Sequence, residues 1–343
     1  MTSWERFVKA ARGQDVDHVP VALIVDCPWL PGFAGIDTLD YFLLPDEWLR
    51  VNLNLLDRFP DVTWIPGFWV EFGMAIEPSA FGGRIVWYHH QPPSIEPLKG
   101  GLQALADMEP ADPQRHGLMP LVLQFYVDAE RRLLSRGLNI KMVGARGPFA
   151  VASWLLGLTD FLIALKIEPE ATSRLLDTLT TTIIAFLQAQ LDILHAPEGI
   201  YVADDIVGML SPEMFKQFVR PYFTRIFGAF DRLIKVYHND MPCMHLAEPM
   251  STLGFHVWNF SHEMDIGTLQ GKMPGVTLMG NVPPLDIMTL GTLEQVEDWA
   301  RQCVRKTGGR RLILSAGGGV GPGTPPEAID VLVRVSRETA ISR

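Results

Sequence analysis

Short apolar runs rich in Val, Ile and Leu recur along almost the whole chain. Most of their residues are apolar, without the strict alternation of a half-buried strand, so each run indicates a strand that is covered on both faces. The runs lie at residues 20–26, 62–68, 139–145, 199–205, 233–238, 256–260, 276–282 and 311–317.

Helical patterns, in which apolar residues recur every three or four positions, follow most of these runs. Strands that alternate with helices predict a parallel sheet, and about eight such units predict an α/β protein of the (β/α)8 TIM barrel class. An open, doubly wound sheet is the alternative, although no Gly-x-Gly-x-x-Gly turn follows the first run. The helical patterns lie at residues 45–59, 169–195, 211–230, 292–308 and 325–339.

One segment interrupts the alternation of strands and helices. Residues 73–117 break the regular order, and the stretch "MAIEPSAFGGRIVWYHHQPP" within them has the pattern of an antiparallel excursion. We therefore expect an inserted hairpin around residues 73–92, after the second strand. No linker-like segment divides the chain, so we expect a single barrel domain over residues 1–343.

Composition narrows the class of protein. A hydrophobic fraction of 48% and a charged fraction of 20% are typical of globular proteins, and a formal net charge of −10 does not favour nucleic acid. No stretch is long and apolar enough to span a bilayer, and the N-terminus lacks the apolar core of a signal peptide. The three cysteines are scattered, which argues against a disulfide framework. We expect a cytoplasmic protein with no nucleic-acid partner and no membrane partner.

The run at 233–238 ends abruptly in ligand-capable side chains. His238 is its last residue, and Asp240 follows two positions later, so both side chains point to the same side of an extended chain. In a barrel of this class the chemistry lies at the carboxyl ends of the strands. A shared metal ion, an Asp that orients the imidazole, and simple capping of the next helix are the three alternatives. Glu77, beyond the second strand, is a candidate third ligand or general acid, or else an ion-paired loop carboxylate.

Polar and aromatic side chains stand at or just after most of the other strand ends. Asp204 and Asp205 are adjacent, so at most one of them points into the mouth. Nine tryptophans fit either an ordinary large core or an aromatic ligand pocket. Asp26, Cys27 and Ser315 also lie near the ends of apolar runs. The side chains that we expect to contact substrate are Trp29, Trp69, Arg146, Asp204, Asn259 and Asn281.

Four segments resemble the uroporphyrinogen decarboxylase superfamily. The resemblance covers nearly the whole chain and implies a (β/α)8 barrel, in agreement with the strand pattern. The segments are "WERFVKAARGQDVDHVPV", "RGPFAVASWLLG", "DDIVGMLSPEMFKQFVRPYFTRIF" and "GGGVGPGTPPEAIDVLV".

The resemblance implies one of two chemistries, of which decarboxylation is the weaker candidate. Uroporphyrinogen carries eight carboxylates, which arginines bind well, and the decarboxylases of the family have an Arg-rich motif after the first strand. Residues 21–49 of this chain contain no Arg or Lys, and the stretch "SAGGGVGPG" lacks the late catalytic histidine of the family.

The other branch consists of corrinoid-dependent methyltransferases. The segment "FGMAIEPSAFG" resembles the Met-x-x-Glu segment of this branch, which nominates Glu77. The branch often binds zinc through a His-x-Cys pair and a Cys near the last strand. This chain has His238-x-Asp240 instead, and the stretch "LSAGGGVG" near the last strand has no Cys. A set of His238, Asp240 and Glu77 is harder than a thiolate set. It suits an oxygen or nitrogen leaving group, with zinc bound or with no metal.

This branch implies transfer of a methyl group from a small, methoxylated aromatic substrate to the cobalt of a corrinoid protein. His238, Asp240 and Glu77 would then be the catalytic residues and would act on the leaving group. The alternatives are methyl transfer from the corrinoid protein to a tetrahydrofolate-type carrier, a porphyrinogen-like decarboxylase, and a binding barrel without catalytic activity.

Overall fold

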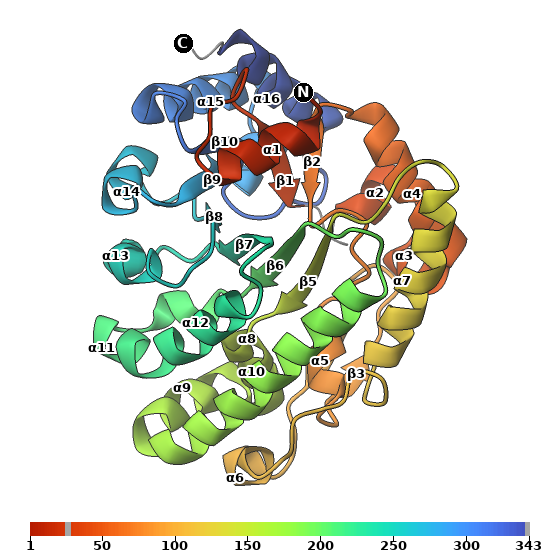
Figure 1. The fold of residues 1–343 in the computed structure, drawn as a ribbon, viewed down its shortest axis with the longest axis vertical. Coiled ribbons are helices and arrows are strands. Elements are labelled where there is room, and N and C mark those ends of the chain that lie inside the picture. Colours follow the sequence, from red (N-terminus) through yellow and green to blue (C-terminus); the bar gives the residue numbers. More distant parts are fainter. Residues whose placement is uncertain (25–28, 340–343) are drawn as a thin grey trace.

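The computed structural model describes residues 1–24 and 29–339. Eight parallel strands form one sheet in the order β2-β1-β10-β9-β8-β7-β6-β5, which curls into a nearly closed barrel surrounded by helices (Figure 1). The predicted (β/α)8 barrel is therefore confirmed. Its strands are β1 (Val21–Ile24), β2 (Val62–Ile65), β5 (Met142–Arg146), β6 (Gly199–Ala203), β7 (Ile234–Asn239), β8 (Val257–Phe260), β9 (Thr277–Val282) and β10 (Leu312–Ala316).

Side-chain caps mark the start of some of the helices. Capping boxes of Thr2 with Glu5 and of Thr292 with Gln295 start α1 and α15. No single helix of the described chain is long and apolar enough to cross a membrane; α8 and α9 reach that length only together, and they are bent by 109°. The helices are α1 (Ser3–Ala11), α2 (Leu30–Ala34), α3 (Thr38–Leu43), α4 (Pro45–Arg58), α5 (Ile76–Ser79), α6 (Gly101–Ala106), α7 (Met119–Leu134), α8 (Pro148–Leu156), α9 (Leu158–Ile167), α10 (Pro169–Asp192), α11 (Pro212–Met214), α12 (Arg220–Gly228), α13 (Ala247–Met250), α14 (Ile266–Lys272), α15 (Leu293–Thr307) and α16 (Pro326–Glu338).

The interior of the barrel is a packed core. One cluster of buried side chains draws on all eight strands and also contains Phe7, Ala10 and Ala11, so α1 closes the amino end of the barrel. Side chains at alternate strand positions face the surrounding helices instead and form a second, larger cluster. The interior is therefore filled from the amino end, and chemistry is confined to the carboxyl ends of the strands.

Strands β2 and β5 are the two edges of the sheet, and in the part of the chain that the structure describes no backbone ladder joins them. Side chains close this seam between β2 and β5. The indole of Trp69 meets Tyr201 edge-on at 5.3 Å between ring centroids and lies against Gly144, where an added Cβ would come within 3.0 Å of the indole nitrogen. The carboxylate of Glu77 accepts a hydrogen bond from the backbone nitrogen of Arg146 at 2.8 Å.

A small antiparallel sheet lies in the segment after β2. It pairs β3 (Arg84–Val86) with β4 (Ser94–Glu96), with Ile85 opposite Ile95. β3 lies within the range of 73–92 expected for a hairpin, whereas β4 lies beyond it. Trp87, between them, packs edge-on against Phe72 at 6.0 Å, which holds this sheet against the segment that follows β2.

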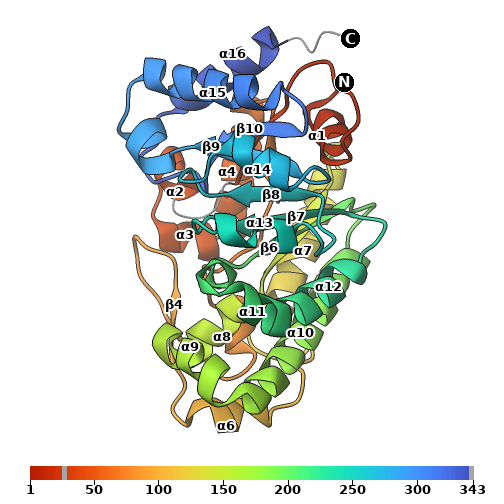
Figure 2. The same cartoon turned by 90° about the vertical axis from the view of Figure 1, so that its left-hand side faces the viewer.

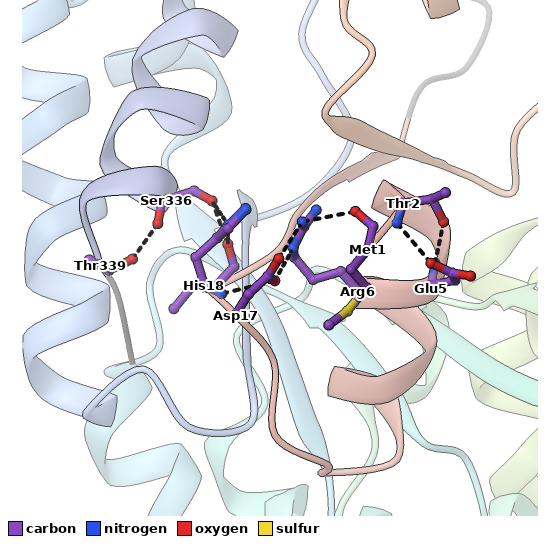
Figure 3. Close-up of polar contacts among 9 residues, drawn as sticks. Met1, Thr2, Glu5, Arg6, Asp17, His18, Ser336 and Thr339 are labelled. Atoms are coloured by element: carbon purple, nitrogen blue, oxygen red, sulfur yellow. Dashed lines mark hydrogen bonds and ion pairs between the residues drawn. The ribbon is translucent and has the colours of Figure 1, made fainter. Parts of the chain in front are cut away.

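The first and last parts of the chain adjoin at one end of the molecule. Figure 2 shows α15 and α16 at that end and α6 at the opposite end, with the strands between them. Arg6 forms an ion pair with Asp17 at 2.6 Å, and this contact lowers the pKa of Asp17 well below its usual range. The Nδ1 of His18 lies 2.9 Å from the hydroxyl of Ser336 (Figure 3). The segment before β1 is thus joined to α1 through Asp17 and to α16 through His18, beside the β1–β10 pairing.

Candidate functional site

The carboxyl ends of β6 and β7 bring three ligand-capable side chains together. One ligand atom each of Asp205, His238 and Asp240 lies within 4.8 Å of the other two. The Nε2 of His238 is 3.6 Å from Oδ1 of Asp205, and the same oxygen accepts a hydrogen bond from the backbone nitrogen of Asp240 at 3.1 Å. His238 and Asp240, two positions apart, thus both lie beside Asp205. From the sequence we had considered Asp205 only as the neighbour of Asp204.

His238 is held in place from the other side of its ring. Its Nδ1 lies 2.8 Å from Oδ1 of Asn259, the residue directly opposite it on β8. Both side chains are buried, and the ring of Tyr201 lies alongside the imidazole, with 6.2 Å between centroids. Asn259 therefore contacts the catalytic candidate itself, although the sequence suggested a contact with substrate.

The glycine-rich turn after β10 leaves room for the carboxylate of Asp240. Gly318 has a φ of +142°, and a Cβ at this position would come within 2.9 Å of Oδ2 of Asp240. Burial raises the pKa of Asp240, partly offset by the nearby His238. A glycine is thus required here by the close approach of a site carboxylate.

The donor set consists of one imidazole and two carboxylates, which suits divalent cations that prefer oxygen and nitrogen ligands. The two cysteines within the described residues do not add a thiolate to it. Burial raises the pKa of Cys243 to about 12 and that of Cys303 to about 11, so both remain thiols near neutral pH. Asp205, His238 and Asp240 could therefore hold a cation such as zinc without sulfur ligands.

Glu77 is not a member of this group of three; it lies at the seam between β2 and β5. Its side chain is 3% exposed, and burial raises the pKa of its carboxyl, although the hydrogen bond from Arg146 opposes that shift. The guanidinium of Arg146 lies 4.8 Å from the ring centroid of Trp69, and its Nη2 is 3.4 Å from Oε2 of Glu71. The roles of Glu77 as an acid and as a metal ligand both stay predictions.

The side chains of Asp204 and Asp205 point in different directions and contact different residues. Asp204 is buried, and its Oδ2 accepts a hydrogen bond at 2.8 Å from the backbone nitrogen of Phe149, in the first turn of α8. A Cβ at Gly147 would come within 2.4 Å of the same oxygen. Asp204 thus holds the start of α8, and Asp205 is the residue that reaches His238. From the sequence we expected Asp204 to contact substrate, which stays a prediction, and we did not select Asp205.

Two further candidates serve as structural anchors. The Nε1 of Trp29 donates to the carbonyl of Thr324 at 2.9 Å, and its ring stacks on Phe33 at 4.7 Å. The amide of Asn281 donates to the carbonyl of Met264 at 2.8 Å, and to that of Ser261. Trp29 and Asn281 remain untested as substrate contacts. The sequence candidates Asp26 and Cys27 lie outside the described residues.

A (β/α)8 barrel with titratable side chains gathered at the carboxyl ends of its strands has the organisation of an enzyme. The chain belongs to the uroporphyrinogen decarboxylase family, because the family model described as "Uroporphyrinogen decarboxylase (URO-D)" matches residues 2–339. Among similar proteins, the uroporphyrinogen decarboxylase of Citrifermentans bemidjiense is 24% identical over 97% of this chain and 99% of its own. That of Synechococcus sp. (strain CC9605) is 29% identical over 96% of this chain and 95% of its own.

Solved structures with the same fold include a methyltransferase. The "methyltransferase from Methanosarcina mazei" superposes with a TM-score of 0.83 at 20% identity, over 98% of this chain and 99% of that chain. A B12-independent methionine synthase from Shewanella sp. W3-18-1 gives a TM-score of 0.55 at 10% identity, over 86% and 88% of the two chains. At such identities the likeness establishes the fold alone.

Proposed function

We propose that this enzyme is a methyltransferase that takes a methyl group from the oxygen of a small methoxylated aromatic compound and passes it to the cobalt of a corrinoid protein. The observation that carries the proposal is the group of Asp205, His238 and Asp240, a set of oxygen and nitrogen ligands at the carboxyl ends of β6 and β7. The fold shared with the Methanosarcina mazei methyltransferase is consistent with it.

Decarboxylation of a porphyrinogen is the second candidate, because the curated relatives are named as decarboxylases. A substrate with eight carboxylates needs several guanidinium groups around it. Residues 21–49 contain no Arg or Lys, and of the barrel strands as the structure describes them only β5 ends in an arginine. That residue, Arg146, already faces Glu71. The strand ends therefore offer little positive charge to a polyanion.

In the proposed reaction the bond between the methyl carbon and the oxygen breaks, and the oxygen keeps both electrons of that bond. The methyl group goes to cobalt(I), which is thereby oxidised to cobalt(III), and the oxygen must gain a proton or a cation. Glu77 is suited to give the proton, because burial favours its protonated form. The backbone nitrogen of Arg146 contacts it at 2.8 Å, and the guanidinium of Arg146 lies 4.8 Å from the ring centroid of Trp69.

Asp205, His238 and Asp240 would hold a divalent cation such as zinc, since their donor atoms lie close together and no thiolate is needed. When bound, such a cation polarises the leaving oxygen as a Lewis acid. The corrinoid of the partner protein supplies the nucleophile that accepts the methyl group. The remaining task of the chain is to hold His238 and the two carboxylates in fixed positions.

The test combines the purified protein with cob(I)alamin and a panel of methoxylated benzoates and phenols. We expect formation of methylcobalamin together with the demethylated compound, and a stoichiometric divalent cation by elemental analysis of the protein. Methyl transfer that runs only from methylcobalamin to tetrahydrofolate would reverse the proposed direction. Coproporphyrinogen formed from uroporphyrinogen, with no demethylation of any panel member, would replace the proposal by the decarboxylase.

A further inference from the structure

We infer that Asn259 is a positioning residue that holds His238 in the tautomer with its hydrogen on Nδ1, so that Nε2 offers its lone pair to the cation that His238 would bind together with Asp205 and Asp240. This inference deepens the proposed function, on whose site it rests. The tautomer is nevertheless a property of the protein alone and can be measured without any activity.

The orientation of the Asn259 amide is fixed by two backbone carbonyls. Its Nδ2 donates to the carbonyl of Met279 at 2.9 Å and to that of Ala316 at 3.0 Å, on the two strands that follow β8 in the sheet. Both amide hydrogens are thereby used. A flipped amide would place Oδ1 against two carbonyl oxygens, so Oδ1 must face His238.

The fixed amide determines which nitrogen of His238 carries hydrogen. Nδ1 lies 2.8 Å from Oδ1 of Asn259, and that oxygen can only accept, so Nδ1 must donate. In the neutral imidazole the lone pair then resides on Nε2, which lies 3.6 Å from Oδ1 of Asp205. Asn259 is 0% exposed, so bulk water cannot compete for this contact.

A histidine that binds a metal or acts as a general base through Nε2 requires this arrangement. A ligating imidazole usually donates its other N–H to a fixed acceptor, and loss of such an acceptor typically lowers metal affinity or activity about 10- to 100-fold. Here the acceptor is a side-chain amide, itself held by the backbone of β9 and β10. Three neighbouring strands thus set the tautomer of one histidine.

Asn281 offers a matched control for Asn259. It is also a buried asparagine, 2% exposed, in a neighbouring strand of the same sheet, and its Nδ2 likewise donates to two backbone carbonyls, of Met264 and Ser261. Its Oδ1 accepts a hydrogen bond from the Sγ of Cys303 at 3.5 Å, whereas the Oδ1 of Asn259 faces His238. Asn259→Leu and Asn281→Leu should therefore carry similar folding costs, but only the first removes the acceptor of His238.

The decisive measurement is the tautomer of His238 by nitrogen NMR of histidine-labelled protein, at a pH where the ring is neutral and with His238→Gln used for assignment. We expect the Nδ1–H form in the wild-type protein and in Asn281→Leu. Asn259→Leu should give a mixture of both tautomers. The Nε2–H form in the wild-type protein would overturn the inference even if every variant failed to fold, as would an unchanged tautomer in folded Asn259→Leu.

Titration of the metal-free protein with Zn²⁺ gives a second readout. We expect Asn259→Leu to weaken binding about 10- to 100-fold, as for other acceptors of ligating histidines, and Asn281→Leu to leave it nearly unchanged. Equal losses in the two variants would reduce Asn259 to a packing residue. A wild-type protein that binds no Zn²⁺ but shows the Nδ1–H tautomer would contradict the proposed cation while supporting the inference.

Discussion

The carboxylate of Glu77 lies 2.8 Å from the backbone nitrogen of Arg146 and joins two segments between which the described residues form no backbone ladder. The N–H belongs to the last residue of β5 and faces the seam, where the next strand would otherwise accept it. Burial of the same carboxyl raises its pKa and favours the protonated form, so the role as an acid that we propose for Glu77 is a second role of this side chain. The two roles can be separated by substitution.

Glu77→Gln should keep the protein folded but lower turnover. The amide oxygen of Gln can still accept from Arg146, whereas the proton donor is lost, which typically costs about two to four powers of ten for an acid group. Glu77→Leu should in addition lose about 1–3 kcal/mol of unfolding free energy, because a buried N–H is left without an acceptor. Denaturant unfolding and methyl-transfer rates check both. A fully active Glu77→Gln would rule out the acid role.

His238→Ala should lower turnover by about two to four powers of ten. It should also cost about 1–3 kcal/mol of unfolding free energy, because the buried Oδ1 of Asn259 loses its partner. Asp240→Asn and Asp205→Asn should also lose most activity, since each keeps its shape but loses a charged ligand. The comparison of rates with unfolding midpoints separates the two effects. Near-normal activity in Asp240→Asn would mean that Asp240 only caps the segment after β7, since Asn caps about as well as Asp.

Gly318→Ala should reduce activity more than a control substitution that destabilises the protein by a similar amount. The new Cβ would lie 2.9 Å from Oδ2 of Asp240 and must displace that carboxylate. Gly323→Ala is the control: it also has a positive φ, +79°, but its nearest neighbour is the methyl of Thr289 at 3.9 Å. Both should lose about 1–3 kcal/mol of stability through backbone strain. Equal activities in the two variants would show that Asp240 has room to move.

Acid should destabilise the protein through His256. Burial, with the charges of Lys235 and Arg12, lowers the pKa of His256 to about 4 from its usual 6.5, and its Nδ1 accepts from the backbone nitrogen of Lys235. The unfolded state therefore takes up a proton first as pH falls. Stability present above pH 6.5 is lost progressively toward pH 4, by on the order of 1–2 kcal/mol between about pH 7 and about pH 5.

Denaturant unfolding of wild-type protein and His256→Gln at about pH 7.5 and about pH 5 checks this. The variant should lose less stability between the two values than the wild type does, because Gln does not titrate. The same loss in both proteins would assign the acid sensitivity to other groups.

The barrel could be predicted from sequence because strands that are buried on both faces must be apolar throughout. The run at 233–238 corresponds to β7, Ile234–Asn239, with a difference of one residue at each end. The site could be predicted in part for a related reason. Parallel strands end at one edge, so that His238 and Asp240 lie beside Asp205.

What the sequence could not give was the direction of individual side chains outside the strands. Asp204 and Asp205 lie just beyond β6, where the turn rather than strand alternation decides that Asp204 faces α8. Trp29 and Trp69 both follow strands, yet only Trp69 belongs to the interior cluster, while Trp29 is tied to the carbonyl of Thr324. Sequence composition and spacing do not distinguish a tryptophan in the barrel interior from one that packs outside it.

The seam between β2 and β5 also gives the barrel one line along which local opening breaks few hydrogen bonds. Other neighbouring strands of the described barrel are joined by a ladder of backbone hydrogen bonds. Separation of β2 from β5 disturbs mainly the side-chain contacts of Trp69 and Glu77. Amide hydrogen exchange should therefore start at the facing edges of β2 and β5 before it reaches β7 and β8. A ligand that contacts both Trp69 and Arg146 would hold the two edges together. Slower amide hydrogen exchange in β2 and β5 would therefore indicate that such a ligand is bound.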